Sequence, residues 1–200
     1  MSFSILTVCS GNICRSPLAE QLLRAGLADV DGVTIRSAGT IAMVGTGMPS
    51  EAQALAARFG VRDAPAHVGR QLDEQAISNA DLVLGMAREH RRSVVELVPA
   101  ATRRTFTLRE FAHLAASVTD IDLDDAASPL GDGTVSSRLR DAVVAAASLR
   151  GIVEPFNVPD DADVIDPYRR SAAVYEESAA QLLPAVKSTI ALLARAAARA

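Results

Sequence analysis

The stretch VCSGNICRSPLAE, residues 8–20, joins a predicted strand to a predicted helix through a short turn that contains glycine. Before it, residues 4–8 (SILTV) are apolar and include β-branched side chains, as in a buried strand. After it, leucines recur at helical spacing between Pro17 and Ala28, and proline is well tolerated in the first turn of a helix. A strand, a turn and a helix in this order predict an α/β protein.

The same alternation continues along most of the chain. Three further strands are predicted, at Val33–Ser37, Ala80–Met86 and Thr105–Leu108. Three further helices are predicted, from Pro49 or Ser50 to about Phe59, at Glu89–Val98, and from Tyr168 or Arg169 to about Arg195 with a kink at Pro184. Because strands that alternate with helices form parallel sheets covered on both faces, we expect such a sheet here.

Residues from about 112 to 162 break this alternation, and we interpret them as an insertion into a single domain of residues 1–200. The insertion begins with an acidic loop, continues with a predicted helix at Ser136–Leu149, and ends in an arm rich in proline and aspartate. A chain of 200 residues that is 49% hydrophobic is large enough to bury one substantial core.

Charge and hydropathy exclude two classes of partner. The net charge is −4 and the basic residues are spread along the chain, so we expect no nucleic-acid partner. No apolar run approaches the roughly 18 residues that a membrane span needs, and the N-terminus does not read as a signal peptide. We therefore expect a cytoplasmic protein without membrane insertion.

Metal-binding patterns are also weak. Two cysteines are too few for a disulfide framework, and their Cys-x4-Cys spacing with three scattered histidines does not match a zinc site. Asp120, Asp122 and Asp124 resemble the start of a calcium loop, but Asp125 replaces its glycine and Gly131 its closing glutamate. We expect a solvated acidic loop at this place and no metal site.

The turn between the first strand and helix has the chemistry of an anion site. Such a turn presents unpaired backbone N–H groups, and Arg15 adds a planar fork that can bind two oxygens of a tetrahedral anion. The same field favours the thiolate of Cys9, a nucleophile. A free cysteine is more often a small buried hydrophobic residue, and Cys-x5-Arg alone is only suggestive.

The longer string CSGNICRSP, residues 9–17, resembles the signature of the low-molecular-weight protein tyrosine phosphatases. Three further matches follow in the family order, at residues 37–40 (SAGT), 67–72 (HVGRQL) and 166–168 (DPY). The resemblance covers about residues 1–111 and 163–195. It implies a three-layer α/β/α fold with a four-stranded parallel sheet in the order 2-1-3-4, the flavodoxin-like phosphotyrosine phosphatase I fold.

The resemblance also implies the catalytic roles. Cys9 attacks phosphorus and forms a cysteinyl-phosphate, Arg15 and the loop amides bind the phosphate, and Asp166 is the general acid and then the base. The implied phosphate-binding residues are Ser10, Gly11, Asn12, Ile13, Cys14, Arg15 and Ser16, and the implied loop supports are Asn12, Ser16, Ser37 and His67. No cofactor is implied. His90 and His113 match nothing in the pattern, and we interpret them as surface or core residues.

Residues at the rim of the predicted site affect which phosphorylated substrate can enter it. The resemblance places Ile13, Met43 and Tyr168 there, and Ile13 favours phosphotyrosine because a related subgroup with threonine at its position acts on phosphoarginine. Met43 and Arg169 depart from the eukaryotic pattern, which points to the bacterial branch. Its members often act on tyrosine kinases that control exopolysaccharide export. We expect a phosphotyrosine protein as substrate, such a kinase as partner, and a monomer or weak dimer.

Three further hypotheses concern redox chemistry and alternative functions. In this family the second loop cysteine, here Cys14, can form a reversible disulfide with Cys9 that protects the nucleophile. Arsenate reductases share the fold but need a further cysteine pair, which this chain lacks, and a catalytically idle phosphoprotein-binding module is the other alternative.

The insertion lies directly before the segment that carries Asp166. Our hypothesis is that the insertion covers the active site. In this hypothesis its helix packs beside the last helix, and its arm helps to select a protein substrate.

Overall fold

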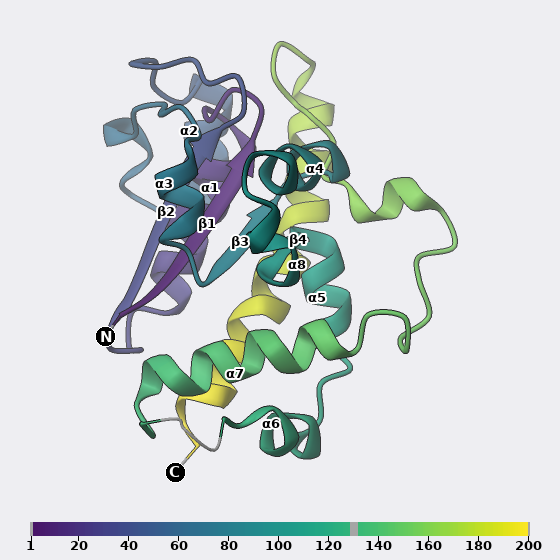
Figure 1. Cartoon of the computed structure of the whole chain (residues 1–200). Coiled ribbons are helices and arrows are strands. Elements are labelled where there is room, and N and C mark those ends of the chain that lie inside the picture. The colour runs from purple at the N-terminus through teal and green to yellow at the C-terminus, as the bar shows by residue number, and fades with distance from the viewer. Residues whose placement is uncertain (1, 129–131, 200) are drawn as a thin grey trace.

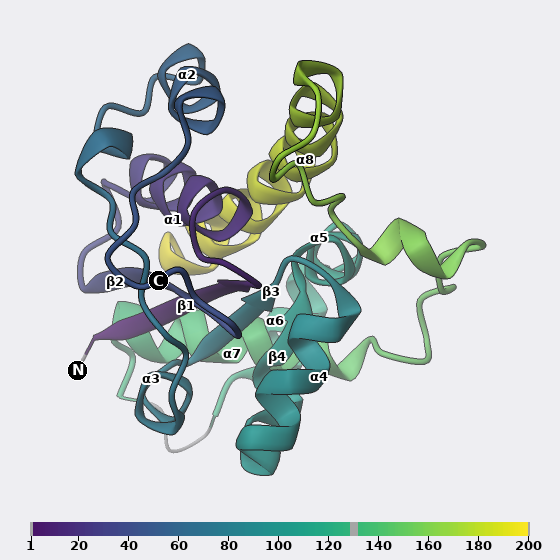
Figure 2. The ribbon, with the colours of Figure 1, turned by 90° about the horizontal axis from the view of Figure 1, so that it is seen from above.

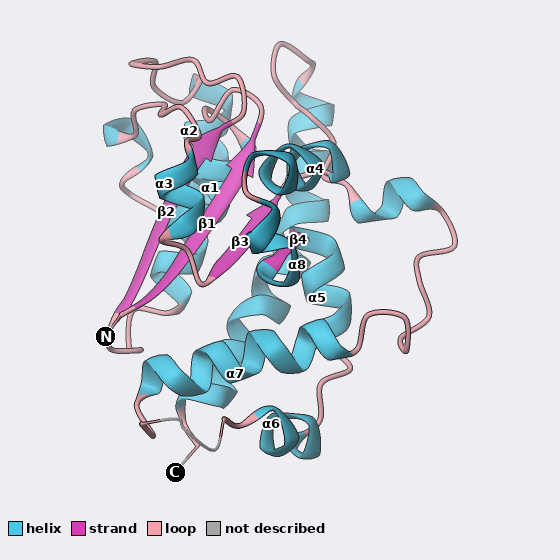
Figure 3. Ribbon diagram, in the orientation of Figure 1, coloured by secondary structure: helices cyan, strands magenta, loops and turns pink. Residues whose placement is uncertain are grey.

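A computed structural model describes residues 2–128 and 132–199 and contains a four-stranded parallel sheet. The strands are β1 (Phe3–Cys9), β2 (Val33–Gly39), β3 (Leu82–Gly85) and β4 (Thr105–Thr107). Their spatial order is β2-β1-β3-β4, which confirms the order implied by the resemblance (Figures 1 and 3). The four strands lie within one or two residues of the predicted ranges.

Helices cover both faces of this sheet, as predicted for an α/β protein. They are α1 (Arg15–Gly26), α2 (Ser50–Arg58), α3 (Glu74–Ser78), α4 (Arg88–Leu97), α5 (Leu108–Ala115), α6 (Asp120–Ala126), α7 (Val135–Ser148) and α8 (Ala172–Ala197). Seen from above, α1 and α8 lie on one side of the strands and α3 and α4 on the other (Figure 2). None of the helices in the described residues is both long and apolar enough to cross a membrane.

The alternating side chains of β1 show how the two layers are held. Phe3 and Ile5 point into the larger hydrophobic cluster, which also contains buried residues of α1, α5 and α8. Leu6 and Val8 point into a smaller cluster on the opposite face, with Ile77 of α3. Because successive side chains of a strand face opposite sides, a nearly continuous apolar run is what a sheet buried on both faces requires.

The helices of the presumed insertion are part of the main core. Leu139 and Val143 of α7 are buried in the larger cluster, and α7 packs against α8, as predicted. Arg140 of α7 binds Asp81 at 2.8 Å and the carbonyl oxygen of Ser2 at 3.0 Å, next to the amino ends of β3 and β1. The helix therefore lies near the amino ends of β1 and β3, whereas Cys9 lies at the carboxyl end of β1. The expectation that the insertion covers the active site is wrong for this helix.

The predicted acidic loop is wrong, because residues 120–126 form helix α6. Thr119 caps it: its hydroxyl accepts a hydrogen bond from the Asp122 N–H, and the Asp122 carboxylate accepts one from the Thr119 N–H at 2.7 Å. Carboxylates in the first turn also interact favourably with the positive end of the helix dipole. Local capping thus accounts for a helix where the charge pattern alone indicated a loop.

Two other boundaries differ from the prediction. Helix α5 was not predicted; it follows β4 directly and starts at a capping box formed by Thr107 and Glu110. Helix α8 begins at Ala172 and not at Tyr168 or Arg169, because Arg169 has a φ of 58° that a right-handed helix excludes. The helix then continues through Pro184 to Ala197.

Candidate active site

The loop of residues 9–16, called the phosphate loop below, connects β1 to α1 at the carboxyl edge of the sheet. Its first four carbonyl groups all accept hydrogen bonds from outside the loop: Cys9 from the Thr40 N–H (2.9 Å), Ser10 from the Ile41 N–H (3.0 Å), Gly11 from the Met43 N–H (2.9 Å) and Asn12 from His67 Nε2 (2.7 Å). The neighbouring chain passes so close that a Cβ atom at Gly39 would lie 2.4 Å from the Ser10 carbonyl oxygen. The loop carbonyls are therefore engaged away from its centre.

This arrangement leaves backbone donors for an anion. In the described part of the chain, the N–H groups of residues 11–14 have no hydrogen-bond acceptor. Asn12 adopts a positive φ of 54°, a conformation that asparagine tolerates better than most residues and that occurs where consecutive N–H groups converge. The free donors stand directly before the N-terminus of α1, so the helix dipole adds to the preference for negative charge.

Side chains hold the loop in this shape. The Ser16 hydroxyl lies 2.9 Å from Cys9 Sγ and accepts a 2.9 Å hydrogen bond from Asn12 Nδ2. Asn12 Oδ1 accepts from the Arg70 N–H at 2.9 Å, while its carbonyl is held by His67. Asn12 and Ser16 are fully buried. A buried polar network in which each member has a partner fixes one geometry, here that of the Cys9 sulfur.

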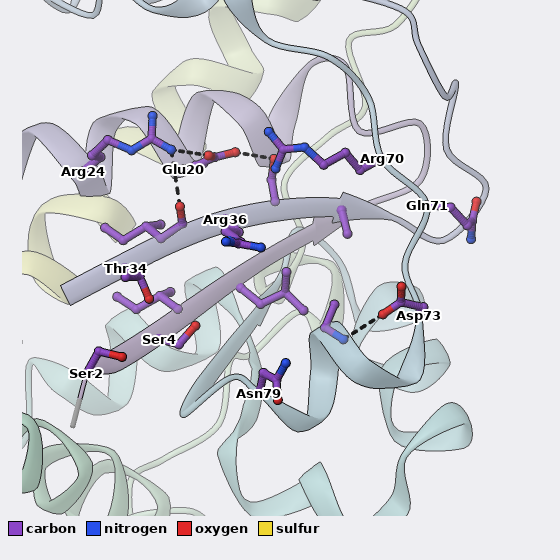
Figure 4. Close-up of a pocket in the computed structure, with 16 residues that line it drawn as sticks. Ser2, Ser4, Glu20, Arg24, Thr34, Arg36, Arg70, Gln71, Asp73 and Asn79 are labelled. Atoms are coloured by element: carbon purple, nitrogen blue, oxygen red, sulfur yellow. Dashed lines mark hydrogen bonds and ion pairs between the residues drawn. The ribbon is translucent and has the colours of Figure 1, made fainter. Parts of the chain in front are cut away.

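Ser37, also predicted as a loop support, contacts α1 and not the phosphate loop. Its hydroxyl donates to Glu20, which is in turn paired with Arg24, and Arg24 also binds the carbonyl oxygen of Ile35 (Figure 4). These residues line a cavity of about 820 Å³ along the outer edge of β2, and the lining does not include Cys9, Arg15 or Asp166. The Ser37 hydroxyl thus connects β2 to α1, the helix that follows the phosphate loop, and its role as a loop support stays a prediction.

Arg15 is buried although it carries a charge, with only 4% of its surface exposed. Its Nη1 donates to the carbonyl oxygen of Val164 at 2.9 Å, and its Nη2 donates to Asp166 Oδ2 at 2.6 Å. Its Nε is buried with no acceptor in the described residues. A buried guanidinium with a free donor beside converging N–H groups is suited to bind an oxyanion.

A cavity of about 280 Å³ opens above the phosphate loop. It is lined by Cys9, Ser10, Gly11, Ile13, Cys14, Arg15, Ile41, Met43, Asp166 and Tyr168. The predicted nucleophile, phosphate-binding arginine, general acid and three rim residues thus meet at one cavity, although 157 positions separate Cys9 from Asp166. The Asp166 side chain is about half exposed (49%), while Cys9 is buried, so the carboxyl faces the cavity mouth.

Two side chains at this site were missed by the sequence analysis or assigned no role. The Tyr175 hydroxyl of α8 lies 3.9 Å from Cys14 Sγ, and burial raises the pKa of Cys14 to about 12. The Ser10 hydroxyl lies 2.9 Å from Nε2 of His90, at the start of α4. His90 is 1% exposed and its Nδ1 has no partner in the described residues. The sequence contains one signal that could have placed His90 at this site, namely its position shortly after β3.

Because His90 is buried, stability is expected to depend on pH. Burial, and then the charge of Arg15, lower the pKa of His90 to about 4. The unfolded chain binds a proton at this residue below about pH 6.5, so folding becomes less favourable as the pH falls from there toward 4. His90→Gln should therefore lose less in Tm than the wild type between pH 7 and pH 5. His113→Gln is the matched control, and an equal pH slope for His90→Gln and the wild type would contradict this expectation.

Metal ligands are not clustered in the part of the chain that the structure describes. No group of three or more histidine, cysteine, aspartate or glutamate side chains there is arranged to hold a metal ion. The three aspartates of the calcium-like motif lie on α6, where two of them pair with Arg199.

Comparison with known proteins places this geometry in a family. A family model described as low molecular weight phosphotyrosine protein phosphatase matches residues 4–133. The low molecular weight protein-tyrosine-phosphatase Ptp of Acinetobacter johnsonii is 37% identical over 105 residues, which are 52% of this chain and 71% of that protein. The protein-arginine-phosphatase of Geobacillus stearothermophilus is 38% identical over 125 residues, which are 62% of this chain and 79% of that protein.

The structural comparison agrees. The crystal structure of the tyrosine phosphatase AmsI of Erwinia amylovora has a TM-score of 0.65 and 27% sequence identity, and the match covers 96% of this chain and 93% of that chain. The family match extends over more than half of the sequence and includes the whole phosphate loop. From its sequence, its sheet order and its loop, this chain belongs to the low molecular weight phosphotyrosine protein phosphatase family.

Proposed function

We propose that this chain hydrolyses phosphotyrosine in a protein substrate through a cysteinyl-phosphate intermediate on Cys9. The observation that carries the proposal is the phosphate loop itself: free N–H groups at residues 11–14, a buried Arg15 with a free Nε, and the Cys9 sulfur beside the Ser16 hydroxyl. Donors placed in advance around a tetrahedral anion stabilise the charge that develops on its equatorial oxygens during phosphoryl transfer.

In the first step, the Cys9 thiolate attacks phosphorus in line and the bond to the tyrosine oxygen breaks. Asp166, protonated, donates its proton to the leaving phenolate. In the second step, Asp166 as carboxylate takes a proton from water, which attacks phosphorus and releases Cys9 as a thiolate. A hydrogen bond from the Ser16 hydroxyl at 2.9 Å favours that thiolate.

The lining of the cavity favours an aromatic ester. Ile13 is buried at 3% exposure and lines the cavity with Met43, while Tyr168 offers a half-buried aromatic face at its mouth. An apolar slot that ends in charged donors fits a flat phenyl ring better than a phosphorylated guanidinium, which needs polar partners. This is our reason to prefer phosphotyrosine over phosphoarginine, although relatives from Geobacillus stearothermophilus and Bacillus subtilis are named protein-arginine-phosphatases.

The test is turnover of p-nitrophenyl phosphate, a phosphotyrosine peptide and a phosphoarginine peptide by the purified protein. The proposal requires higher kcat/KM for the phosphotyrosine peptide, with Ile13→Thr shifting the ratio toward phosphoarginine. Higher kcat/KM for phosphoarginine would overturn the substrate. Phosphate binding without turnover would favour the idle binding module, and turnover of arsenate with a thiol reductant would favour an arsenate reductase.

We propose that residues 1–200 form a single domain, which the shared core of α7 and α8 supports. A bacterial tyrosine kinase that controls exopolysaccharide export is the proposed partner, on the strength of the family resemblance. We further propose that the chain is a monomer or weak dimer.

Oxidation should distinguish the two cysteines of the loop. The raised pKa of Cys14 keeps it a thiol, whereas the Cys9 sulfur lies beside the Ser16 hydroxyl and the free N–H groups of the phosphate loop, so we expect peroxide to attack Cys9 first. We expect thiol treatment to restore activity to peroxide-treated wild type through reduction of a Cys9–Cys14 disulfide. Cys14→Ala should remain inactive, because its Cys9 oxidises beyond the reversible stage. Equal recovery of both proteins would show that Cys14 gives no protection.

A further inference from the structure

The segment that carries Asp166 has no helix or strand of its own and is held by bonds to several elements. The Val164 N–H donates to the carbonyl oxygen of Met86 at the end of β3 (2.8 Å), and its carbonyl accepts from Arg15 (2.9 Å). The Ile165 N–H donates to Gln181 of α8 at 2.8 Å. These bonds hold residues 164 and 165 in place. The residue before them connects the proline- and aspartate-rich arm of the insertion to this segment.

That residue is Asp163, which has four hydrogen bonds to Arg88. Its carboxylate accepts from the Arg88 backbone N–H (2.8 Å), from Nε (3.2 and 3.1 Å to the two oxygens) and from Nη2 (2.9 Å). Its own carbonyl accepts from Arg109 of α5 at 2.9 Å. Arg88 is the first residue of α4, whose N-cap, Ala87, has no capping side chain, so the Asp163 carboxylate also caps the helix.

Asp166 itself has few bonds. Its carboxylate accepts from Arg15 Nη2 and from the Tyr168 N–H at 3.1 Å. A phosphate held by Arg15 competes with Asp166 for the same guanidinium. When substrate binds, the place of the Asp166 carboxyl therefore depends more on its backbone, and Asp163 is only three residues away, at most about 11 Å of extended chain.

We propose that Arg88 and Asp163 form a positioning pair that sets the place of the Asp166 carboxyl over the cavity. The pair ties the end of the proline- and aspartate-rich arm to α4, which starts just after β3 at the carboxyl edge of the sheet. Asp160 also binds Arg88, but its side chain is 85% exposed against 26% for Asp163, and it makes no backbone contact with α4. The inference rests on the proposed role of Asp166 as general acid.

The test uses two substrates that differ in leaving group, p-nitrophenyl phosphate and phenyl phosphate. Phenolate is the poorer leaving group and needs the proton more, so a displaced acid lowers kcat/KM more for phenyl phosphate. For Asp163→Ala we expect a fall of roughly tenfold with phenyl phosphate, part of the 10²- to 10⁴-fold that a general acid contributes, and at most about threefold with p-nitrophenyl phosphate. Asp160→Ala is the matched control and should leave the ratio of the two unchanged.

Arg88→Gln removes the pair from its other side and should give the same substrate-dependent loss, which decides the question if Asp163→Ala does not fold. The double variant should lose no more than either single variant, since both remove one interaction. Equal losses on both substrates, or none, would overturn the positioning role. Asp166→Asn in the same series separates the two proposals: if it also shows no dependence on the leaving group, Asp166 is not the acid and both fail.

Discussion

Cys9→Ser is expected to abolish turnover while leaving phosphate binding intact. The serine hydroxyl is a far weaker nucleophile than a thiolate, and the side chain that bonds to the sulfur, the Ser16 hydroxyl at 2.9 Å, is not a base that could activate it. Loss of a covalent nucleophile typically lowers kcat by roughly 10⁴-fold or more. Steady-state hydrolysis of p-nitrophenyl phosphate measures the loss, and inhibition constants or titration with inorganic phosphate measure the binding that should remain.

Cys14→Ser provides the matched control for this result. Cys14 is buried in the same loop and its Sγ contacts Tyr175, but it lies outside the route of attack, so its variant should keep kcat within a few-fold of the wild type. If Cys9→Ser retained substantial turnover, or if Cys14→Ser were the inactive one, the assignment of the nucleophile would be wrong.

Asp166→Asn is expected to show the second-largest effect, a fall of about 10²- to 10⁴-fold in turnover of a phosphotyrosine peptide. The asparagine amide can still accept a hydrogen bond from Arg15 Nη2, so the local structure should survive, but it cannot give a proton to the phenolate or take one from water. Single-turnover and steady-state kinetics together separate the two steps, and both should be slower in the variant.

An exposed aspartate of the same arm serves as control. Asp161→Asn also replaces a carboxylate that is about half exposed, here 3.7 Å from Arg109, and it should leave turnover nearly unchanged. A loss of similar size in both variants would indicate a general electrostatic effect of the arm, and an active Asp166→Asn would remove Asp166 from the mechanism.

The sequence contained enough information for the sheet and for the loop. β1 and β3 are short apolar runs, each followed by a loop that leads into a helix, and this pattern directly reflects burial on both faces of a parallel sheet. The phosphate loop could be located because the glycine-containing turn, Cys9 and Arg15 follow one another between the first strand and helix, whereas the role of Asn12 was implied only by the family resemblance. Periodicity was sufficient for the sheet, whereas the site residues required the resemblance of the longer signature.

Elements determined by capping or by distant contacts could not be predicted in this way. Helix α6 has an acidic sequence typical of a solvated loop, but the mutual bonds of Thr119 and Asp122 cap it, Leu123 is buried in the core, and two of its aspartates pair with Arg199. The pairing of Asp163 with Arg88 joins residues 75 positions apart, and nothing in the sequence around either one indicates the other. The contact of His90 with Ser10 spans 80 positions and depends on β1 and β3 being neighbours in the sheet.

The most direct test of the account is detection of the covalent intermediate. Asp166→Asn, with its slowed hydrolysis step, is mixed with p-nitrophenyl phosphate, whose good leaving group lets the first step proceed, and is quenched in acid within the first turnover. Mass spectrometry of the digested protein should find one phosphoryl group on the peptide that contains Cys9, at an amount that matches the burst of nitrophenolate. Turnover without bound phosphate, or phosphate on any other residue, would contradict the mechanism.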